Sequence, residues 1–203
     1  GGWDLAGALG TNHVLQELRL SSNRVAIPVA EKMLTCVGDQ QALMVLDLGY
    51  CYLGAEGARM VSELLPRFPL LKELYLSWNE ILDKGCNCIA QMLPTARNLE
   101  KLDIAHNSIK DVSALAEALK GCKVYVIDLD GNDVDDNGAA ALAEAIRVMK
   151  YIGELGLKAN ENITGTGEKK LRQAAWANQS LPKVRLGPYE EEKAEEDAED
   201  DLP

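Results

Sequence analysis

The 203-residue sequence has few aromatic residues and no long apolar run. Phe68 is its single phenylalanine, and aromatic residues make up 5% of a chain that is 47% hydrophobic. A core must therefore be built mainly from leucine and other aliphatic side chains, which suits a core that repeats one shape. No run of about 18 apolar residues occurs, so we expect no membrane span, and no apolar signal segment provides a secretory address.

Motifs typical of enzymes are also missing. The two histidines, His13 and His106, do not lie in a recognisable serine or cysteine nucleophile motif. The glycines of "GTGEKK" at residues 165–170 fall at a predicted helix start and do not form a G-x-x-x-x-G-K-[ST] phosphate loop. We therefore expect a protein that is not an enzyme and needs no cofactor.

The five cysteines do not form a recognisable disulfide or zinc framework. Their number is odd, and they are scattered along the chain. Cys86 and Cys88 could join His106, but no second closely spaced Cys/His pair completes a tetrahedral metal site. We interpret the cysteines as small buried residues of a protein in a reducing compartment, the cytoplasm. The glycosylation-type triplets at Asn162 and Asn178 are then chance matches.

The net charge of −11 is concentrated near the C-terminal end. Residues 190–203, "EEEKAEEDAEDDLP", contain nine acidic residues and one lysine, so they carry −8 and residues 1–189 carry the remaining −3. Such a run cannot bury apolar surface, and it predicts a folded domain over 1–189 followed by a disordered acidic tail over 190–203. Nucleic acid is not expected as a partner, because its phosphates would be repelled.

A leucine-rich pattern recurs along almost the whole chain. In "LKELYLSWN", residues 71–79, leucines stand at positions 71, 74 and 76 and an asparagine at 79. Related stretches begin at Leu15, Leu43, Leu99, Val124 and Ile152, with a degenerate copy at Leu181. The starts are separated by 28, 28, 28, 25, 28 and 29 residues. Such a period predicts a repeat protein.

The first half of each copy predicts a strand. Leu74 and Leu76 alternate so that a strand would turn both toward the core, while Tyr75 would face the other side. An asparagine then stands where the chain leaves the strand, and its amide can satisfy backbone groups of the turn. This position holds Asn23, Cys51, Asn79, Asn107, Asn132 and Asn160.

The second half of each copy predicts a helix. Gly57, Gly85 and Gly138 stand 14 residues after a repeat start, and Asp83 and Asp135 are expected to begin helices. Apolar residues follow at helical spacing: Val61, Leu64, Leu65, Ile89, Met92, Leu93, Leu142 and Ile146. The first residues, "WDLAGALGTNHV", read as a helix without its strand or polar cap, so we expect a piece of a longer protein.

These motifs resemble the leucine-rich repeat family, and the repeat length is that of the ribonuclease-inhibitor-like subtype. The resemblance covers about residues 3–189. It implies an α/β solenoid, or horseshoe, with parallel strands on the concave face and helices on the convex face. It also implies a non-enzymatic protein–protein interaction module, a scaffold or adaptor in a larger intracellular assembly, with cytoskeletal and ciliary assemblies among the settings.

One alternative function stays open. Ran GTPase-activating proteins are similar in repeat type and also end in an acidic tail. However, no GTPase-contacting motif can be matched residue by residue to this sequence. An aspartate-rich face is also poorly suited to stabilising the charge of a transferred phosphoryl group.

The predicted binding surface combines aspartates with aromatic residues. Outward strand positions place four aspartates around Tyr75 on the concave face: Asp47, Asp103, Asp128 and Asp130. In the loops that follow, equivalent places hold Tyr50, Trp78 and His106. Exposed aromatic residues that the core does not need are typical of binding hot spots. We expect a partner with a basic, helical or extended segment.

A structural reading of the same rings also stays open. Trp78 could simply lie on the neighbouring loop while Tyr75 stacks with Tyr50. The sequence leaves the oligomeric state undetermined.

Overall fold

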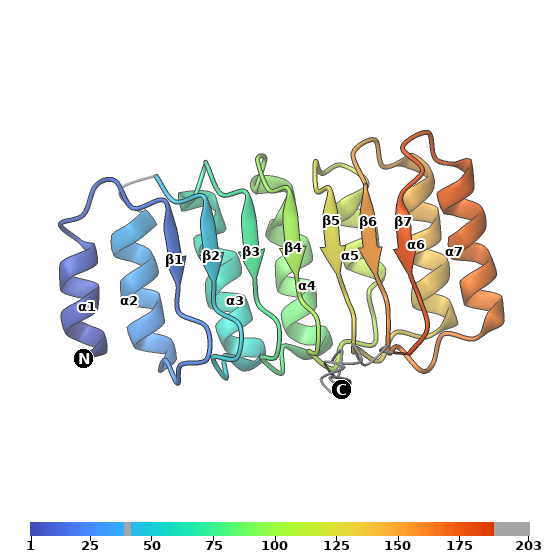
Figure 1. Ribbon diagram of the computed structural model, residues 1–203. Helices are drawn as coiled ribbons and strands as arrows, with labels where there is room; N and C mark the ends of the chain where they lie inside the picture. The colour runs from blue at the N-terminus through green and yellow to red at the C-terminus, as the bar shows by residue number, and fades with distance from the viewer. Residues whose placement is uncertain (39–41, 189–203) are drawn as a thin grey trace, which may run out of the picture.

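The computed structural model describes residues 1–38 and 42–188, which form a curved stack of strand–helix units (Figure 1). Seven three-residue strands in the described part of the chain pair in sequence order: β1 (Glu17–Arg19), β2 (Val45–Asp47), β3 (Glu73–Tyr75), β4 (Lys101–Asp103), β5 (Val126–Asp128), β6 (Glu154–Gly156) and β7 (Lys183–Arg185). All six pairings are parallel. The predicted α/β leucine-rich repeat solenoid is confirmed.

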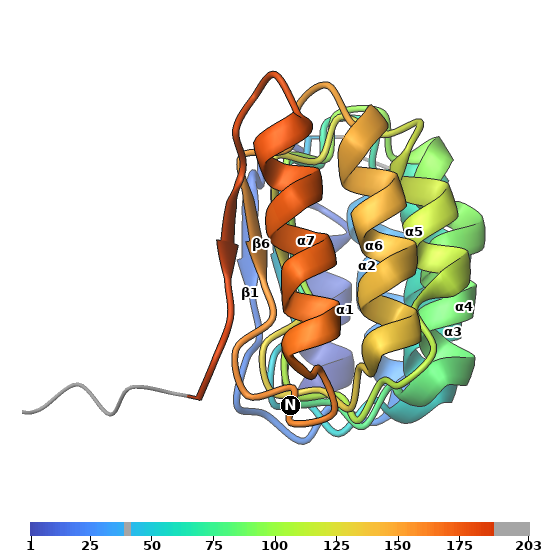
Figure 2. The ribbon, with the colours of Figure 1, turned by 90° about the vertical axis from the view of Figure 1, so that its right-hand side faces the viewer.

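The helices form a second layer on one side of the sheet, as the view along the stack shows (Figure 2). They are α1 (Gly2–Leu9), α2 (Ile27–Gly38), α3 (Gly54–Leu64), α4 (Leu82–Met92), α5 (Ser113–Leu119), α6 (Asp136–Val148) and α7 (Gly165–Ala177), with 3₁₀ turns η1 (Leu65–Arg67) and η2 (Leu93–Thr95). Among the described residues, no helix covers the other face of the sheet, which is open (Figure 2). Each unit therefore buries its apolar side mainly against its neighbours.

The register of the sheet follows the leucine pattern. The central residue of each strand pairs with the central residue of the next, in the series Leu18, Leu46, Leu74, Leu102, Ile127, Leu155 and Val184. Leu46, Leu74 and Leu102 are fully buried. A slip of one residue would turn charged strand residues into this core, so the hydrophobic pattern determines the register.

The helix layer closes the core in the way the spacing predicts. Val61, Leu65, Ile89 and Leu93 are buried, and Leu64 and Met92 pack partly buried against them. The one 25-residue interval corresponds to the short helix α5, which has 7 residues where α4 has 11 and α6 has 13. The shortening falls on the helix because the strand and its following turn must keep their register with both neighbours.

The two aspartates expected at helix starts behave differently. Asp135 is the N-cap of α6, as predicted, and its carboxylate accepts the backbone N–H groups of Asn137 and Gly138. Asp83 also lies at a helix start, in the first turn of α4, but it is not the N-cap, which is Ile81. Asp83 Oδ1 instead accepts the N–H groups of Lys110 and Asp111 in the next unit, at 2.7 and 2.9 Å. Asp83 therefore joins two units rather than capping its own helix.

The predicted asparagine ladder is the main polar structure of the interior. Asn79 Oδ1 accepts the N–H groups of Cys51 and Leu53 at 3.0 and 3.1 Å, and its Nδ2 donates to the Leu48 carbonyl at 2.8 Å. Asn107, Asn132 and Asn160 repeat this bridge to the preceding unit. At the same position Cys51 Sγ donates to the Leu20 carbonyl at 3.2 Å.

The described residues contain no disulfide, and all five cysteines are free. Burial, with a smaller effect of Asp83 and Asp111, raises the pKa of the Cys86 thiol to about 12, so it stays protonated at neutral pH. No helix in this part of the chain is long and apolar enough to cross a membrane. No group of three or more His, Cys, Asp or Glu residues among the described ones is arranged to hold a metal ion. The predicted acidic tail, 190–203, lies outside the described residues.

We expect Asn107→Ala to lower the free energy of unfolding by about 2–4 kcal/mol. The change leaves the buried N–H groups of Asn79 and Ile81 without their acceptor, and each unsatisfied buried group costs about 1–3 kcal/mol. Urea unfolding followed by circular dichroism measures the loss. Asn23→Ala is the matched control, because Asn23 is exposed and its amide donates only to the nearby Leu20 and Ser21 carbonyls. Equal losses in the two variants would contradict the ladder.

Candidate protein-binding surface

Tyr75 lies at the middle of the open face of the sheet. The strand register places Asp47 and Asp103 directly on either side of it, as the sequence predicts. Its hydroxyl donates to Glu73 Oε2 at 2.6 Å, and Lys101 Nζ lies 4.8 Å from the centre of the ring. Burial is the main cause of the raised pKa of Tyr75. The ring thus stands among charges of both signs, and its partners differ from the Tyr50 stack that the sequence left open as an alternative.

The aspartates of the strands share one local hydrogen bond. In Asp47, Asp103 and Asp128, Oδ1 accepts the N–H of the residue two positions later, in each case at 3.0 Å. This bond holds the carboxylate against its own strand end, so the side chain is ordered before any partner arrives. Burial raises the pKa of Asp103, and the nearby Asp128 charge raises it further.

Arg185, which the sequence reading missed, divides the predicted aspartate group. Its Nη2 lies 2.8 Å from Asp128 Oδ2, its Nη1 3.3 Å from Asp130 Oδ2, and its Nε 2.9 Å from Glu154 Oε1. The side chain reaches Asp128 across β6 at Gly156, where a Cβ would lie 2.3 Å from Nη2. Asp128 and Asp130 are therefore already paired within the fold, and Asp47 and Asp103 are the predicted aspartates without such an ion pair.

Asp130 is the most buried of the four aspartates. Its side chain is only 4% exposed, and Oδ1 accepts the N–H of Lys158 at 2.8 Å. The Asp130 carboxylate is therefore nearly buried, and it links β5 to the turn after β6. A signal for this arrangement was present in the sequence, since Gly156 occupies the strand position between Asp128 and Arg185, but the degenerate last copy, "LPKVRLGPY", obscured it.

The three loop residues predicted to be equivalent form one continuous stack, which we call the aromatic stack: Tyr50, Trp78 and His106. The Tyr50 and Trp78 rings are 4.9 Å apart and inclined by 16°, and the Trp78 and His106 rings are 3.8 Å apart and inclined by 12°. The His106 ring ends against Gly131, where a Cβ would lie 2.3 Å from it. Burial lowers the pKa of His106, which favours the neutral imidazole. Trp78 remains 45% exposed.

The backbone under the aromatic stack is left-handed. Tyr50, Trp78 and His106 have φ angles of 56°, 59° and 53°, a region that costs most side chains about 1–2 kcal/mol. The equivalent turns of other units hold Ser22, Gly131 and Ala159, also at positive φ. The fold therefore requires this backbone conformation but does not require a ring. Three large rings in succession are a property of the surface, and their stacking offsets part of the strain.

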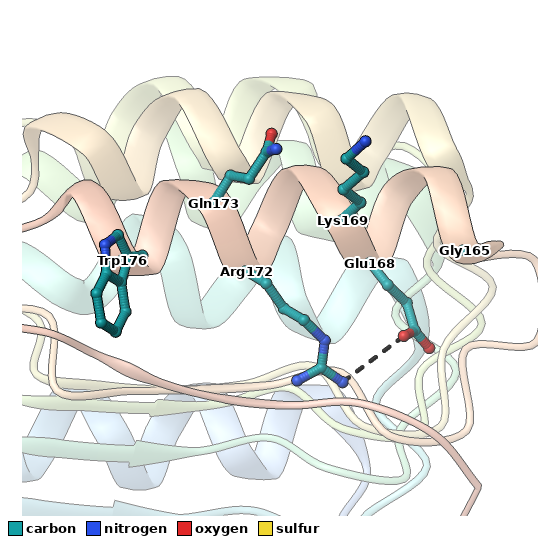
Figure 3. A pocket seen from close by; sticks show the side chains of 6 residues that line it. All are labelled: Gly165, Glu168, Lys169, Arg172, Gln173 and Trp176. Carbon is teal, nitrogen blue, oxygen red and sulfur yellow. Dashed lines mark ion pairs between the residues drawn. The ribbon is translucent and has the colours of Figure 1, made fainter.

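A shallow hollow also lies on α7 (Figure 3), away from the predicted residues. Its lining consists of Gly165, Glu168, Lys169, Arg172, Gln173 and Trp176, and Arg172 pairs with Glu168 at 3.6 Å. All of these residues come from one helix, so the hollow is a depression between neighbouring side chains. We do not assign it a ligand.

Comparison with known proteins agrees with this geometry. The family model described as "Leucine Rich repeat" matches residues 69–90, 95–116 and 122–143. The chain belongs to the leucine-rich repeat family. It is of the ribonuclease-inhibitor-like type, since it is 28% identical over 191 residues to the ribonuclease inhibitor of Mus musculus, a match covering 90% of this chain and 41% of that protein.

A second relative and one solved structure extend the comparison. Protein NLRC5 of Homo sapiens is 33% identical over 137 residues, which cover 66% of this leucine-rich repeat chain and 7% of that protein. The tropomodulin C-terminal domain of Caenorhabditis elegans has the same fold, with a TM-score of 0.56, 12% identity and coverage of 87% of this chain and 92% of that one. The chain thus spans less than half the length of these two sequence relatives. Its repeat fold is that of a protein-interaction module.

We expect Asp130 to make the stability of this repeat protein pH-dependent. Burial raises the pKa of Asp130 from about 3.8 to about 6, so the folded protein keeps a proton that the unfolded chain releases. This contribution to the free energy of unfolding is fully present below about pH 4 and is lost as the pH rises to about 6, by at most about 3 kcal/mol.

Asp130→Asn should remove this part of the pH profile. The check is urea unfolding at several pH values between about 4 and 7, with the variant's profile subtracted from that of the unchanged protein. Asp133→Asn, at an exposed position in the same turn, is the control. Parallel profiles for Asp130→Asn and the unchanged protein would show that Asp130 does not cause the effect.

Proposed function

We propose that the chain is a non-enzymatic scaffold or adaptor module that binds a partner protein through its concave face and the adjoining aromatic stack. The exposed ring of Trp78, held between Tyr50 and His106, is the observation that carries the proposal. Its neighbours Leu76 and Asn79 are fully buried and already serve the core and the ladder. The stack is a rigid apolar surface that loses little conformational entropy when a partner covers it.

The charges next to the stack support a basic segment as its ligand. Asp47 and Asp103 flank Tyr75, and their positions are set by hydrogen bonds to their own strand ends. The Tyr75 ring already has Lys101 at 4.8 Å and Arg19 at 6.0 Å, and these contacts within the chain support a cation as a ligand of this ring. An arginine or lysine of a helical or extended partner segment would find a ring and two carboxylates within one strand spacing.

We expect Asp128 and Asp130 to contribute less to binding of the proposed ligand than Asp47 and Asp103. The carboxylates of Asp128 and Asp130 are both paired with Arg185, so they form one end of the acidic surface rather than its centre. A partner would have to displace Arg185 to use them. For the setting, we propose a larger cytoplasmic assembly of cytoskeletal or ciliary type, which is supported by fold-level analogy alone.

We expect Trp78→Gly to weaken binding of the basic partner at least about tenfold, equivalent to about 1.4 kcal/mol. The same change should alter the free energy of unfolding by no more than about 1 kcal/mol, because glycine relieves the left-handed backbone while two ring contacts are lost. Affinity capture with mass spectrometry identifies the partner, and calorimetric titration then gives Kd. Trp176→Ala is the control, since Trp176 is 84% exposed on α7.

Two results would oppose this function. If Trp78→Gly, alone or combined with Tyr75→Ala, captures the same partner equally well, the concave face and the aromatic stack are not the binding surface. If the protein accelerates GTP hydrolysis by Ran, the alternative regulator function replaces the scaffold. No acceleration of Ran would remove that alternative.

A further inference from the structure

A second candidate surface lies at the opposite edge of the sheet from the aromatic stack. It is a groove of about 540 Å³ lined by residues at the starts of β3 to β5 and in the loops that enter β4 to β7. These strands begin at the upper edge of the sheet in Figure 1. The residues that determine the chemistry of the groove are Lys101, Lys123, Tyr125, Lys150 and Tyr151. We call it the lysine groove. None of its residues belongs to the aromatic stack or to the four predicted aspartates.

The lysine groove carries a net positive charge. Glu100 pairs with Lys72 at 3.5 Å, which leaves the three lysines of the groove against the single carboxylate of Glu73. Within the described residues, by contrast, Lys123 and Lys150 form no ion pair, and both are exposed. Two ammonium groups are therefore available at the rim. A ligand with carboxylates would gain two charge pairs without breaking any that the fold already uses.

The tyrosines give the lysine groove a firm apolar floor. Tyr125 is 57% exposed and Tyr151 is 51% exposed. The Tyr125 ring lies across Gly153, where a Cβ would come within 2.1 to 2.6 Å of ring and hydroxyl atoms. Only a residue without a Cβ lets the ring lie there. The backbone at Gly153, just before β6, therefore supports one face of Tyr125 and leaves the other face for a ligand. Such supported rings lose little entropy on binding.

We infer that the lysine groove binds an acidic, extended segment of a partner protein. The carboxylates pair with Lys123 and Lys150, and intervening apolar side chains lie on Tyr125 and Tyr151. The concave side then has two ends of opposite preference, with a basic segment favoured beside the aromatic stack and an acidic one in the lysine groove. Lys101 lines the groove and also lies 4.8 Å from the Tyr75 ring, but the residues proposed to bind the two segments differ, Lys123 and Lys150 for the acidic one and Trp78 for the basic one.

The test uses the full chain and a fluorescein-labelled decaglutamate peptide, with fluorescence anisotropy at low ionic strength. The Lys123→Gln, Lys150→Gln pair should weaken peptide binding at least about fivefold. The Lys169→Gln, Lys170→Gln pair makes the same change in net charge on α7 and should alter Kd by less than about twofold. A peptide of alternating glutamate and leucine should bind more tightly than decaglutamate, and Tyr151→Ser should remove that gain.

Three outcomes would overturn the inference. Equal weakening by the two lysine pairs would show only long-range attraction to net charge. Unchanged binding in the Lys123→Gln, Lys150→Gln pair, with circular dichroism showing a folded protein, would exclude the lysine groove. Binding that appears only when the nine acidic residues of 190–203 are replaced by amides would mean that the chain's own acidic segment is the ligand.

The same assay separates this inference from the proposed function. Trp78→Gly should leave decaglutamate binding unchanged, because the lysine groove lies at the other edge of the sheet. Loss of decaglutamate binding in Trp78→Gly would contradict two independent sites. If Trp78→Gly no longer captures the partner but still binds decaglutamate normally, both proposals are supported.

Discussion

The fold depends on one polar constraint, which is that each turn after a strand satisfies its backbone groups through the side chain of the next unit. The strands have only three residues, so the sheet ladder ends before the chain has turned toward its helix. Asn79 and Asn107 supply the missing acceptors for the preceding unit and donate to carbonyls there and in their own unit. Because a buried N–H without a partner is costly, no unit is complete without its neighbour.

The same turn creates the candidate binding surface. In these turns the residue before the inward ladder position has a left-handed backbone: Tyr50 before Cys51, Trp78 before Asn79 and His106 before Asn107. The inner residue is constrained by the ladder, whereas the outer one is constrained only in backbone conformation. Surface chemistry can therefore vary without disturbing the core. The aromatic stack uses this freedom in three consecutive units.

Charge pairing refines what the aspartates can do. A list of outward strand positions gives a uniformly acidic centre, but Arg185 reaches over Gly156 and forms ion pairs with Asp128 and Asp130 on one side of it. The aspartates without an ion pair lie beside Tyr75. At the opposite edge, lysines stand together with Tyr125 and Tyr151. The two edges of the concave side therefore differ in charge, which neither the net charge nor the column of aspartates indicates.

The sequence by itself determined the period, the strand register, the asparagine ladder and the equivalence of Tyr50, Trp78 and His106. These follow from side-chain alternation and a repeat near 28 residues, which are local and additive signals. Only the tertiary structure decided that the three rings stack, that Asp83 bonds to the next unit and that Arg185 pairs with Asp128, 57 residues away. Those contacts depend on how far a side chain reaches across its neighbours, and on where a missing Cβ leaves room, which spacing along the chain does not specify.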